Sequence, residues 1–321
     1  MKLGVVAVLL QDLPLREALA YLKGAGVQMV EIGCGGFPGK AHCDPEVLLA
    51  DERKFAEFRE SIDIYGMEIS ALSAHGNAVH PQKEVAEQFH RDFENAVLLA
   101  EKLGIHRINT FSGCPGDCPT SRYPNWVTCP WPGDFLEILD YQWNEVLIPY
   151  WKKEAVFARS HGVDKICFEM HPGFCVYNPE TLLRLRAAVG PEIGANFDPS
   201  HLIWQGIDPV RAIYVLKDCI FHFHAKDTAV NAYNVAVNGV LDTKHYSEIA
   251  DRSWVFRSVG YGNDTKYWKD IVSALRTVGY DDVMSIEHED SLMSPQEGLS
   301  KAIAVLKEAM TFEEASEMWW A

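Results

Sequence analysis

The chain has 321 residues, of which 48% are hydrophobic and 23% are charged, and its formal net charge is -16. This composition is typical of a globular enzyme, and the length is enough for one large α/β domain. The negative charge argues against nucleic acid as a partner, because binding to its backbone depends on clustered Lys and Arg.

The first ten residues resemble the apolar part of a signal peptide, but Gln11 and Asp12 end the run early and no small-residue cleavage site follows. We interpret the run as the first strand. No apolar run reaches the roughly 20 residues that a membrane span requires. The eight cysteines fit reduced thiols, as expected for a chain without an export signal. The sequence therefore predicts a cytoplasmic protein that does not bind membranes.

Apolar runs of strand length alternate with segments of helical period along the whole chain. Between residues 82 and 103, for example, Val85, Phe89, Phe93 and Val97 recur at helical spacing. This alternation is typical of repeated βα units, and eight parallel strands close a barrel. The sequence therefore predicts a single-domain (β/α)8 TIM barrel over residues 1–321. Its expected strands span residues 3–8, 28–32, 68–73, 106–111, 165–170, 192–197, 219–225 and 282–287.

Two connections are longer than a minimal βα loop. Residues 112–134 follow the fourth expected strand, and residues 227–264 follow the seventh. Long loops in a compact domain are usually functional or disordered, and aromatic residues such as Trp131 and Trp254 disfavour disorder. Loops that follow barrel strands lie on the face where barrel enzymes build their sites. We therefore expect both loops to cover a substrate.

Four ionisable residues stand where strand-like apolar runs end: Glu169, Asp198, His224 and Glu287. An unpaired charge at the end of a buried strand costs several kcal/mol, so a fourfold recurrence indicates a metal site at the mouth of the barrel. Three carboxylates and one imidazole suit a divalent cation that prefers oxygen ligands. Mn²⁺ fits this donor set first, and Zn²⁺, Co²⁺ and Mg²⁺ stay open.

The segments around these residues resemble the superfamily of xylose-isomerase-like TIM barrels. This superfamily contains ketose 3-epimerases, inosose isomerases and dehydratases, hydroxypyruvate isomerase and DNA-repair enzymes of the endonuclease IV type. The resemblance implies that Glu169, Asp198, His224 and Glu287 hold the metal, and that Glu169 and Glu287 also exchange the substrate proton. It spans the whole chain and is carried by Phe168-Glu169-Met170-His171-Pro172, Asn196-Phe197-Asp198-Pro199-Ser200-His201, His224-Ala225-Lys226-Asp227 and Gly260-Tyr261-Gly262-Asn263-Asp264.

Departures from the sequence patterns of the superfamily narrow the choice among its functions. The DNA-repair members share His75 and His201 with this chain but need further histidines, and residues 109–112 read Asn-Thr-Phe-Ser where one would stand. The ketose epimerases place an arginine shortly after the metal histidine, so Lys226, or Arg257 from farther on, would take that role here. By the same resemblance and their position, His75 and His201 are expected to contact substrate oxygens.

The leading prediction is a metal-dependent isomerase or epimerase that acts on a keto-polyol by proton transfer next to a metal-chelated carbonyl. The alternative is a lyase of the same group, either an inosose-type dehydratase or a subunit that cleaves 3-keto-glycosides. An acid supplied by residues 112–134 would favour elimination. A non-catalytic sugar-binding subunit is a third possibility, against which three costly buried carboxylates argue. The expected partners are a small sugar or cyclitol and further copies of the chain, with a different subunit as an alternative.

Overall fold

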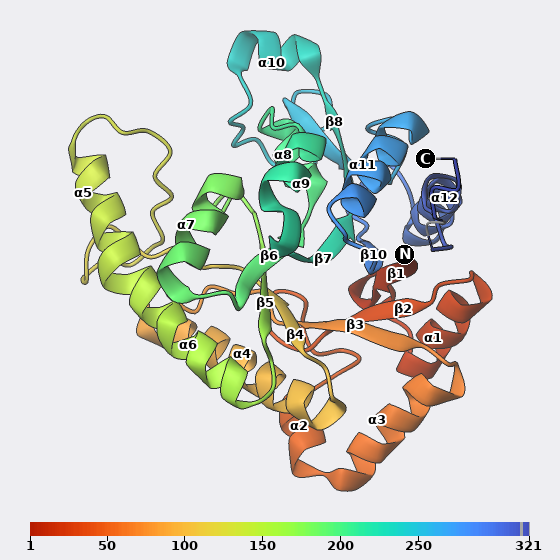
Figure 1. Ribbon diagram of the computed structural model, residues 1–321. Coiled ribbons are helices and arrows are strands. Elements are labelled where there is room, and N and C mark those ends of the chain that lie inside the picture. The colour runs from red at the N-terminus through yellow and green to blue at the C-terminus, as the bar shows by residue number, and fades with distance from the viewer. Residues whose placement is uncertain (315–316, 321) are drawn as a thin grey trace.

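The computed structural model describes residues 1–314 and 317–320, and within these ranges the chain folds into one closed barrel surrounded by helices (Figure 1). Neighbouring barrel strands run parallel, in the order β1-β10-β7-β6-β5-β4-β3-β2. The prediction of a (β/α)8 TIM barrel is therefore confirmed. The strands are β1 (Lys2–Val6), β2 (Met29–Gly33), β3 (Glu68–Ser73), β4 (Arg107–Thr110), β5 (Lys165–Glu169), β6 (Ile193–Phe197), β7 (Ile220–Ala225) and β10 (Val283–Ile286).

All eight expected strands are present, with ends that differ by up to two residues from the prediction. The largest difference is in β1, which ends at Val6 because the short 3-10 helix η1 (Ala7–Leu10) continues the chain. Most strand residues are fully buried, since a parallel sheet inside a ring of helices has no exposed face. The carboxyl ends of all eight strands consequently open on one side of the molecule.

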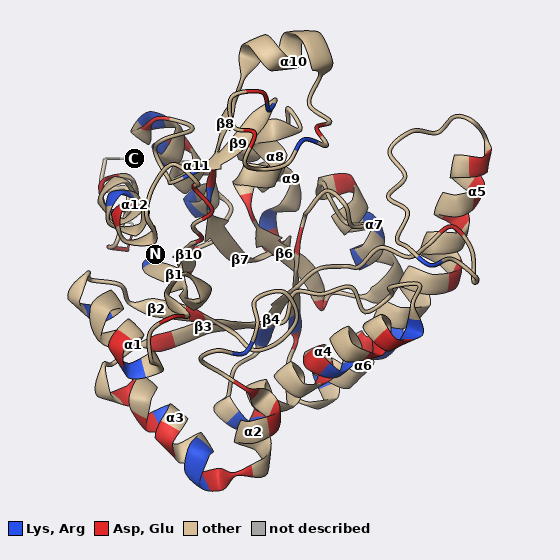
Figure 2. Cartoon of the chain, turned by 180° about the vertical axis from the view of Figure 1, so that it is seen from behind, with Lys and Arg blue, Asp and Glu red and all other residues tan. Residues whose placement is uncertain are grey.

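Helices form the outer layer and cover the apolar outer face of the barrel. In α4, Phe93, Ala96, Val97 and Ala100 face the core, and Gly104, with a left-handed φ of 73°, ends the helix. Figure 2 shows acidic and basic residues spread along these outer helices, with no single basic stripe. The helices are α1 (Leu15–Gly24), α2 (Pro45–Ala50), α3 (Glu52–Ile64), α4 (Lys83–Leu103), α5 (Asp134–Asp140), α6 (Ile148–Ser160), α7 (Pro179–Val189), α8 (Pro199–Trp204), α9 (Pro209–Leu216), α10 (Ala232–Asn238), α11 (Thr265–Thr277) and α12 (Pro295–Ala309), with one π turn, η2 (Tyr141–Leu147), and a second 3-10 turn, η3 (Lys217–Cys219).

The two long connections have different structures. The first runs to α5 and continues through η2 into α6. The second forms an antiparallel pair of strands, β8 (Asp227–Val230) and β9 (Trp254–Arg257), with α10 between them. Both project beyond the barrel at the upper side of Figure 1.

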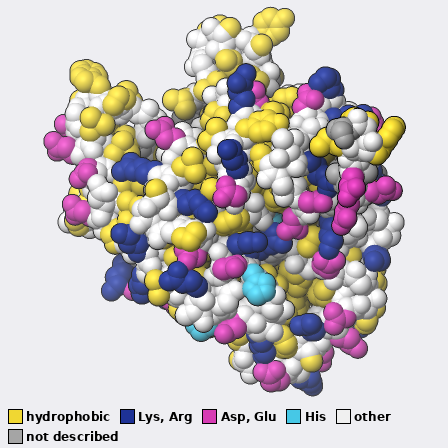
Figure 3. Space-filling model, in the orientation of Figure 1, with side chains coloured by type: hydrophobic (Ala, Val, Ile, Leu, Met, Phe, Trp, Pro, Cys, Tyr) yellow, Lys and Arg dark blue, Asp and Glu magenta, His cyan; other side chains and the backbone are white. Residues whose placement is uncertain are grey.

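Hydrophobic side chains gather on the surface of these two projections (Figure 3). Tyr233 and Val237 of α10 are 89% and 82% exposed, and Trp131 before α5 is 79% exposed. The predicted homo-oligomer, or a different subunit, would have to cover such surface; this stays a prediction. Within the described residues, no helix is long and apolar enough to cross a membrane.

Candidate functional site

The four predicted metal ligands meet at the mouth of the barrel. Glu169 is the last residue of β5, His224 lies near the end of β7, and Asp198 and Glu287 directly follow β6 and β10. Each of the four side chains offers a ligand atom within 4.8 Å of the others. The barrel brings them together because the ends of its parallel strands form one ring. The predicted quartet is thus a cluster in the structure.

The atoms of this cluster are arranged around His224 and Lys226. His224 Nδ1 lies 3.3 Å from Glu169 Oε2 and 3.0 Å from Glu287 Oε2. Lys226 Nζ lies 3.1 Å from Asp198 Oδ2 and 2.9 Å from Glu287 Oε2. Despite this ammonium, neither of these buried oxygens accepts a well-oriented hydrogen bond within the described part of the chain. Under-satisfied buried carboxylate oxygens beside an imidazole nitrogen fit a divalent cation.

The charges of the cluster follow from burial and from neighbouring ions. Burial raises the pKa of a carboxyl group, but at Glu169 hydrogen bonds from nearby histidines outweigh it and hold the pKa well below its usual range. At Glu287 the charges of Lys226 and His224 outweigh burial and lower the pKa to about 2. At Asp198 burial prevails and raises the pKa to about 7. Asp198 is therefore the acid whose ionised form most needs a further positive charge.

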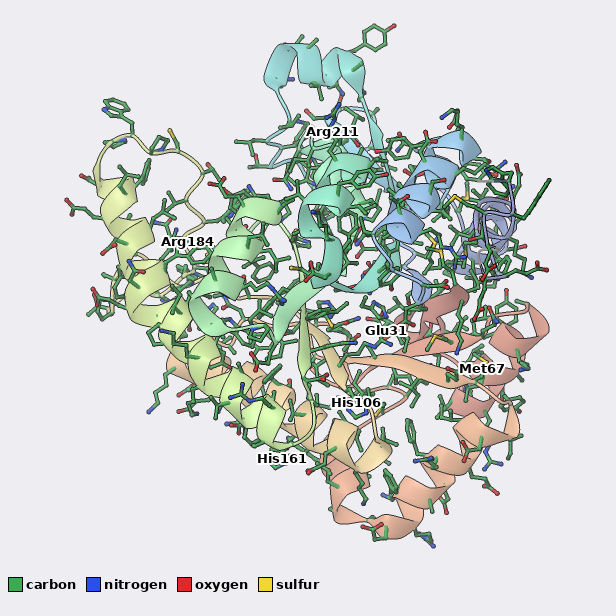
Figure 4. The ribbon with its side chains drawn as sticks, viewed as in Figure 1. Glu31, Met67, His106, His161, Arg184 and Arg211 are labelled. Carbon is green, nitrogen blue, oxygen red and sulfur yellow. The ribbon has the colours of Figure 1, made fainter. Side chains whose placement is uncertain are left out.

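Glu31, in the middle of β2, is a site residue that the sequence reasoning missed. It is fully buried inside the barrel (Figure 4), and its Oε2 accepts a hydrogen bond of 2.8 Å from His224 Nε2. Asn109 Nδ2, at 2.9 Å, and the hydroxyls of Ser73 and Ser285 also donate to this carboxylate. Burial would raise the pKa of Glu31, yet the charge of His224 outweighs it and holds the pKa well below its usual range. Glu31 therefore fixes His224 with Nδ1 directed at the mouth.

Two further predicted residues, His75 and His201, contact the same carboxylate. His75 Nε2 lies 3.2 Å from Glu169 Oε2, and His201 Nε2 lies 3.0 Å from Glu169 Oε1. Both histidines are buried, and burial lowers the pKa of His201 to about 3. In this geometry the two rings fix Glu169 between them, and His75 also lines the cavity described below.

The two residues expected to replace the epimerase arginine lie in different places. Lys226 is fully buried at the mouth and lines the cavity. Arg257 stands in β9, where its Nε donates to Asp290 Oδ2 at 2.9 Å, and it is not among the residues described as lining the cavity. Of the two, Lys226 lies at the cavity, and substrate binding by either residue stays a prediction.

Three members of the cluster, Glu169, His224 and Glu287, lie at the floor of a cavity of about 630 Å³. Phe111 and Phe174 stack with ring centroids 4.3 Å apart, and together with Phe37 they form an aromatic wall. Gly36 has a φ of 64°, and a Cβ at this position would lie only 1.9 Å from the carbonyl oxygen of His75. A glycine here therefore lets the backbone that carries Phe37 approach the backbone of His75. The polar lining consists of Gln11, Asp12, Glu31, Ser73, His75, Glu169, His171, His224, Lys226, Glu287, His288 and Glu289.

The two long loops differ in their relation to the site, although the described lining of the cavity includes no residue of either loop. No described lining residue falls within residues 112–134, which instead pack on η2 and α7, with Gln142 Nε2 donating to Asn125 O at 2.7 Å. This loop contributes no residue to the described lining of the cavity, and its expected role as a substrate cover stays a prediction. The β8–β9 pair does reach the site, since the ring of Phe256 lies 4.8 Å from Lys226 Nζ and 5.3 Å from the ring of His201.

Comparison with known proteins places the chain among related barrels. The chain is 38% identical over 314 residues to the uncharacterized protein YfiH of Bacillus subtilis strain 168, which covers 97% of this chain and 100% of YfiH. A crystal structure of IOLI protein with a binding zinc atom is similar with a TM-score of 0.66 and 18% identity, over 97% of this chain and 100% of that one. A D-tagatose 3-epimerase-like protein is similar with a TM-score of 0.62 and 20% identity, over 96% and 98%.

These two structural similarities concern the fold, whereas a family model matches the sequence itself. The model describes the xylose isomerase-like TIM barrel and matches residues 19–309. The chain therefore belongs to the family of xylose isomerase-like TIM barrels.

Proposed function

We propose that the protein is a divalent-metal-dependent isomerase or epimerase of a small keto-polyol. The observation that carries this proposal is the cluster at the cavity floor, where Glu169 and Glu287 come from separate strands and lie on two sides of His224 Nδ1. Three carboxylates and one imidazole favour Mn²⁺ among the divalent cations, although the similar IOLI structure holds zinc. A bound cation would polarise a carbonyl oxygen and acidify the adjacent C–H.

The protein residues would then move the proton. The pKa of Glu169 and that of Glu287 are both lowered, so the two carboxylates would be ionised at neutral pH and each could accept a proton from a carbon held above the cluster. His75 and His201 hold the Glu169 carboxylate in one orientation. Lys226 is a fixed donor for a substrate oxygen. If the two carboxylates act on opposite faces of one carbon, the product is an epimer.

The charge of the cavity supports an uncharged substrate. The lining contains the carboxyl groups of Asp12, Glu31, Glu169, Glu287 and Glu289, against the single ammonium of Lys226. An added divalent cation would not reverse this excess, so a phosphate or carboxylate group on the substrate would meet net repulsion. A neutral sugar or cyclitol, with hydroxyls that match the polar lining and one face against Phe111, fits better.

The test is solvent exchange. The Mn²⁺-loaded protein is incubated in D₂O with keto-sugars, inososes and 3-keto-glycosides, and the products are analysed by NMR and mass spectrometry. Deuterium at the carbon next to the carbonyl, without a released group, is the expected result. Release of water or of an aglycone would instead assign the lyase alternative, for which residues 112–134 supply no described acid at the cavity. Absence of exchange with every compound would refute both.

A further inference from the structure

A second cluster of possible metal ligands lies outside the barrel, between α4 and α6, which run side by side in Figures 1 and 2. His90 and Glu94 stand one turn apart on α4, and Glu154 on α6 faces them. The three side chains each offer a ligand atom within 4.8 Å of the others. His90 Nε2 lies 3.4 Å from Glu94 Oε1, and His90 Nδ1 lies 3.8 Å from Glu154 Oε1. None of the three lines the cavity at the barrel mouth.

Glu154 is the member of this cluster that points to a ligand. Its side chain is 0% exposed, and neither carboxylate oxygen accepts a well-oriented hydrogen bond within the described residues. Among the described residues, the ammonium that pairs with Glu154 is that of Lys153, 3.4 Å from Oε1, on a side chain that is 70% exposed. A buried carboxylate with both oxygens unsatisfied needs an explanation, and a bound cation would supply one.

We propose that His90, Glu94 and Glu154 form a second divalent-cation site that binds a borderline transition ion such as Zn²⁺. One imidazole and two carboxylates are a donor set that zinc accepts, with a remaining position for water. His90 and Glu94 are 25% and 32% exposed, so an ion can enter from solvent, while Glu154 closes the inner side. The hydroxyl of Tyr150, 3.2 Å from His90 Nδ1, can orient the imidazole ring.

The role of this outer site would be structural. Phe93 of α4 packs edge to face on Trp151 of α6, with ring centroids 5.4 Å apart, and Trp151 packs in turn on Phe168, which precedes Glu169 in β5. An ion held by both helices would therefore fix the layer that supports this strand. Because it binds only the folded chain, it would add stability that grows with the logarithm of its free concentration relative to its dissociation constant.

The competing explanation is a plain ion pair between Glu154 and a protonated His90, and the two explanations predict opposite results for Glu154→Gln. If Glu154 is a cation ligand, the substitution removes a buried charge that lacks a partner in the metal-free protein, and it raises the melting temperature of that protein. It also abolishes the further rise that Zn²⁺ causes through this site. If Glu154 pairs with His90, the substitution lowers the melting temperature of the metal-free protein and leaves the response to Zn²⁺ intact.

Metal binding itself is measured by equilibrium dialysis of chelator-treated protein against Zn²⁺, with metal analysis of the protein. The natural sequence is expected to bind one ion more than Glu154→Gln or His90→Ala. The mouth variant Asp198→Asn is expected to retain the outer ion, so the two sites are separable whatever reaction the mouth catalyses. The matched control is Glu101→Gln, which removes a carboxylate of α4 that pairs with His161 outside the cluster. Equal zinc content in Glu154→Gln, His90→Ala and the natural sequence would overturn the proposal.

Discussion

The ammonium group of Lys226 lies beside buried carboxylates whose negative charge a metal ion would also neutralise. Its side chain is 2% exposed, and Nζ lies within 3.1 Å of carboxylate oxygens of Asp198, Glu287 and Glu289. Lys226→Met keeps the apolar stem and removes the charge. Breaking a buried ion pair in this way costs about 3–5 kcal/mol. For 321 residues, an unfolding entropy of about 2.1 cal/mol/K per residue converts this loss into a fall in melting temperature of roughly 4–7 °C.

The metal should reverse this loss. In the Lys226→Met protein a divalent cation replaces the missing positive charge without a competing ammonium, so Mn²⁺ is expected to bind more tightly than it does to the natural sequence. Calorimetric melting with a chelator and then with saturating Mn²⁺ measures both effects. The control is Lys266→Met, which breaks an exposed pair with Asp270 and should change stability by less than about 1 kcal/mol. An unchanged melting temperature without metal, or Mn²⁺ binding no tighter than that of the natural sequence, would refute the reasoning.

Three further substitutions test the cluster. Asp198→Asn is expected to weaken metal binding more than folding, because the barrel has its own hydrophobic core; unfolding on chelation, followed by circular dichroism, would contradict this. Glu287→Gln should lower turnover by at least the order of 10²-fold while some metal stays bound, since an amide oxygen can ligate but cannot accept the proton. Near-normal turnover of the metal-replete variant would leave Glu287 as a ligand only. Glu31→Gln should lower metal affinity by roughly 10–100-fold, the usual effect of removing a group that orients a ligating histidine, and calorimetric titration that finds unchanged affinity would disprove this role.

The clustering of the four predicted metal ligands at the mouth could be predicted from the sequence because their position depends only on chain order. In a parallel barrel every strand ends on the same side, so a polar residue that directly follows an apolar run lies at the mouth whichever strands are neighbours. Glu169, Asp198 and Glu287 all obey this rule. No knowledge of side-chain packing was needed to bring them together.

Glu31 could not be predicted in the same way. It lies within β2 and meets His224 of β7 across the interior, and β1 and β10 separate these two strands in the wall of the barrel. Such a contact depends on the closure and register of the whole sheet. The only sign in the sequence is an acidic residue between two apolar ones, Val30 and Ile32. Both neighbours are buried in the structure, and a charged side chain in such a strand has no access to solvent.

The direction of the long loops also lay beyond sequence reasoning. Aromatic content indicates that a loop is ordered, but it does not say which surface the aromatics cover. Trp126 packs edge to face on Tyr177, away from the cavity, whereas Phe256 of β9 packs on the site. Strand β8 directly follows β7, and β9 pairs with β8. This pairing holds β9 at the mouth.

His224 connects the barrel interior to the mouth, because each of its ring nitrogens contacts a different carboxylate group. Nε2 donates to Glu31 inside the barrel, and Nδ1 faces Glu169 and Glu287 at the mouth. The negative charge of Glu31 makes Nδ1 a better ligand, whereas the positive charge of Lys226 competes with a cation for the same oxygens. Substitutions of Glu31 and Lys226 should therefore shift metal affinity in opposite directions, although both remove a buried charge. Opposite shifts cannot arise from a general loosening of the fold, which would weaken binding in both variants.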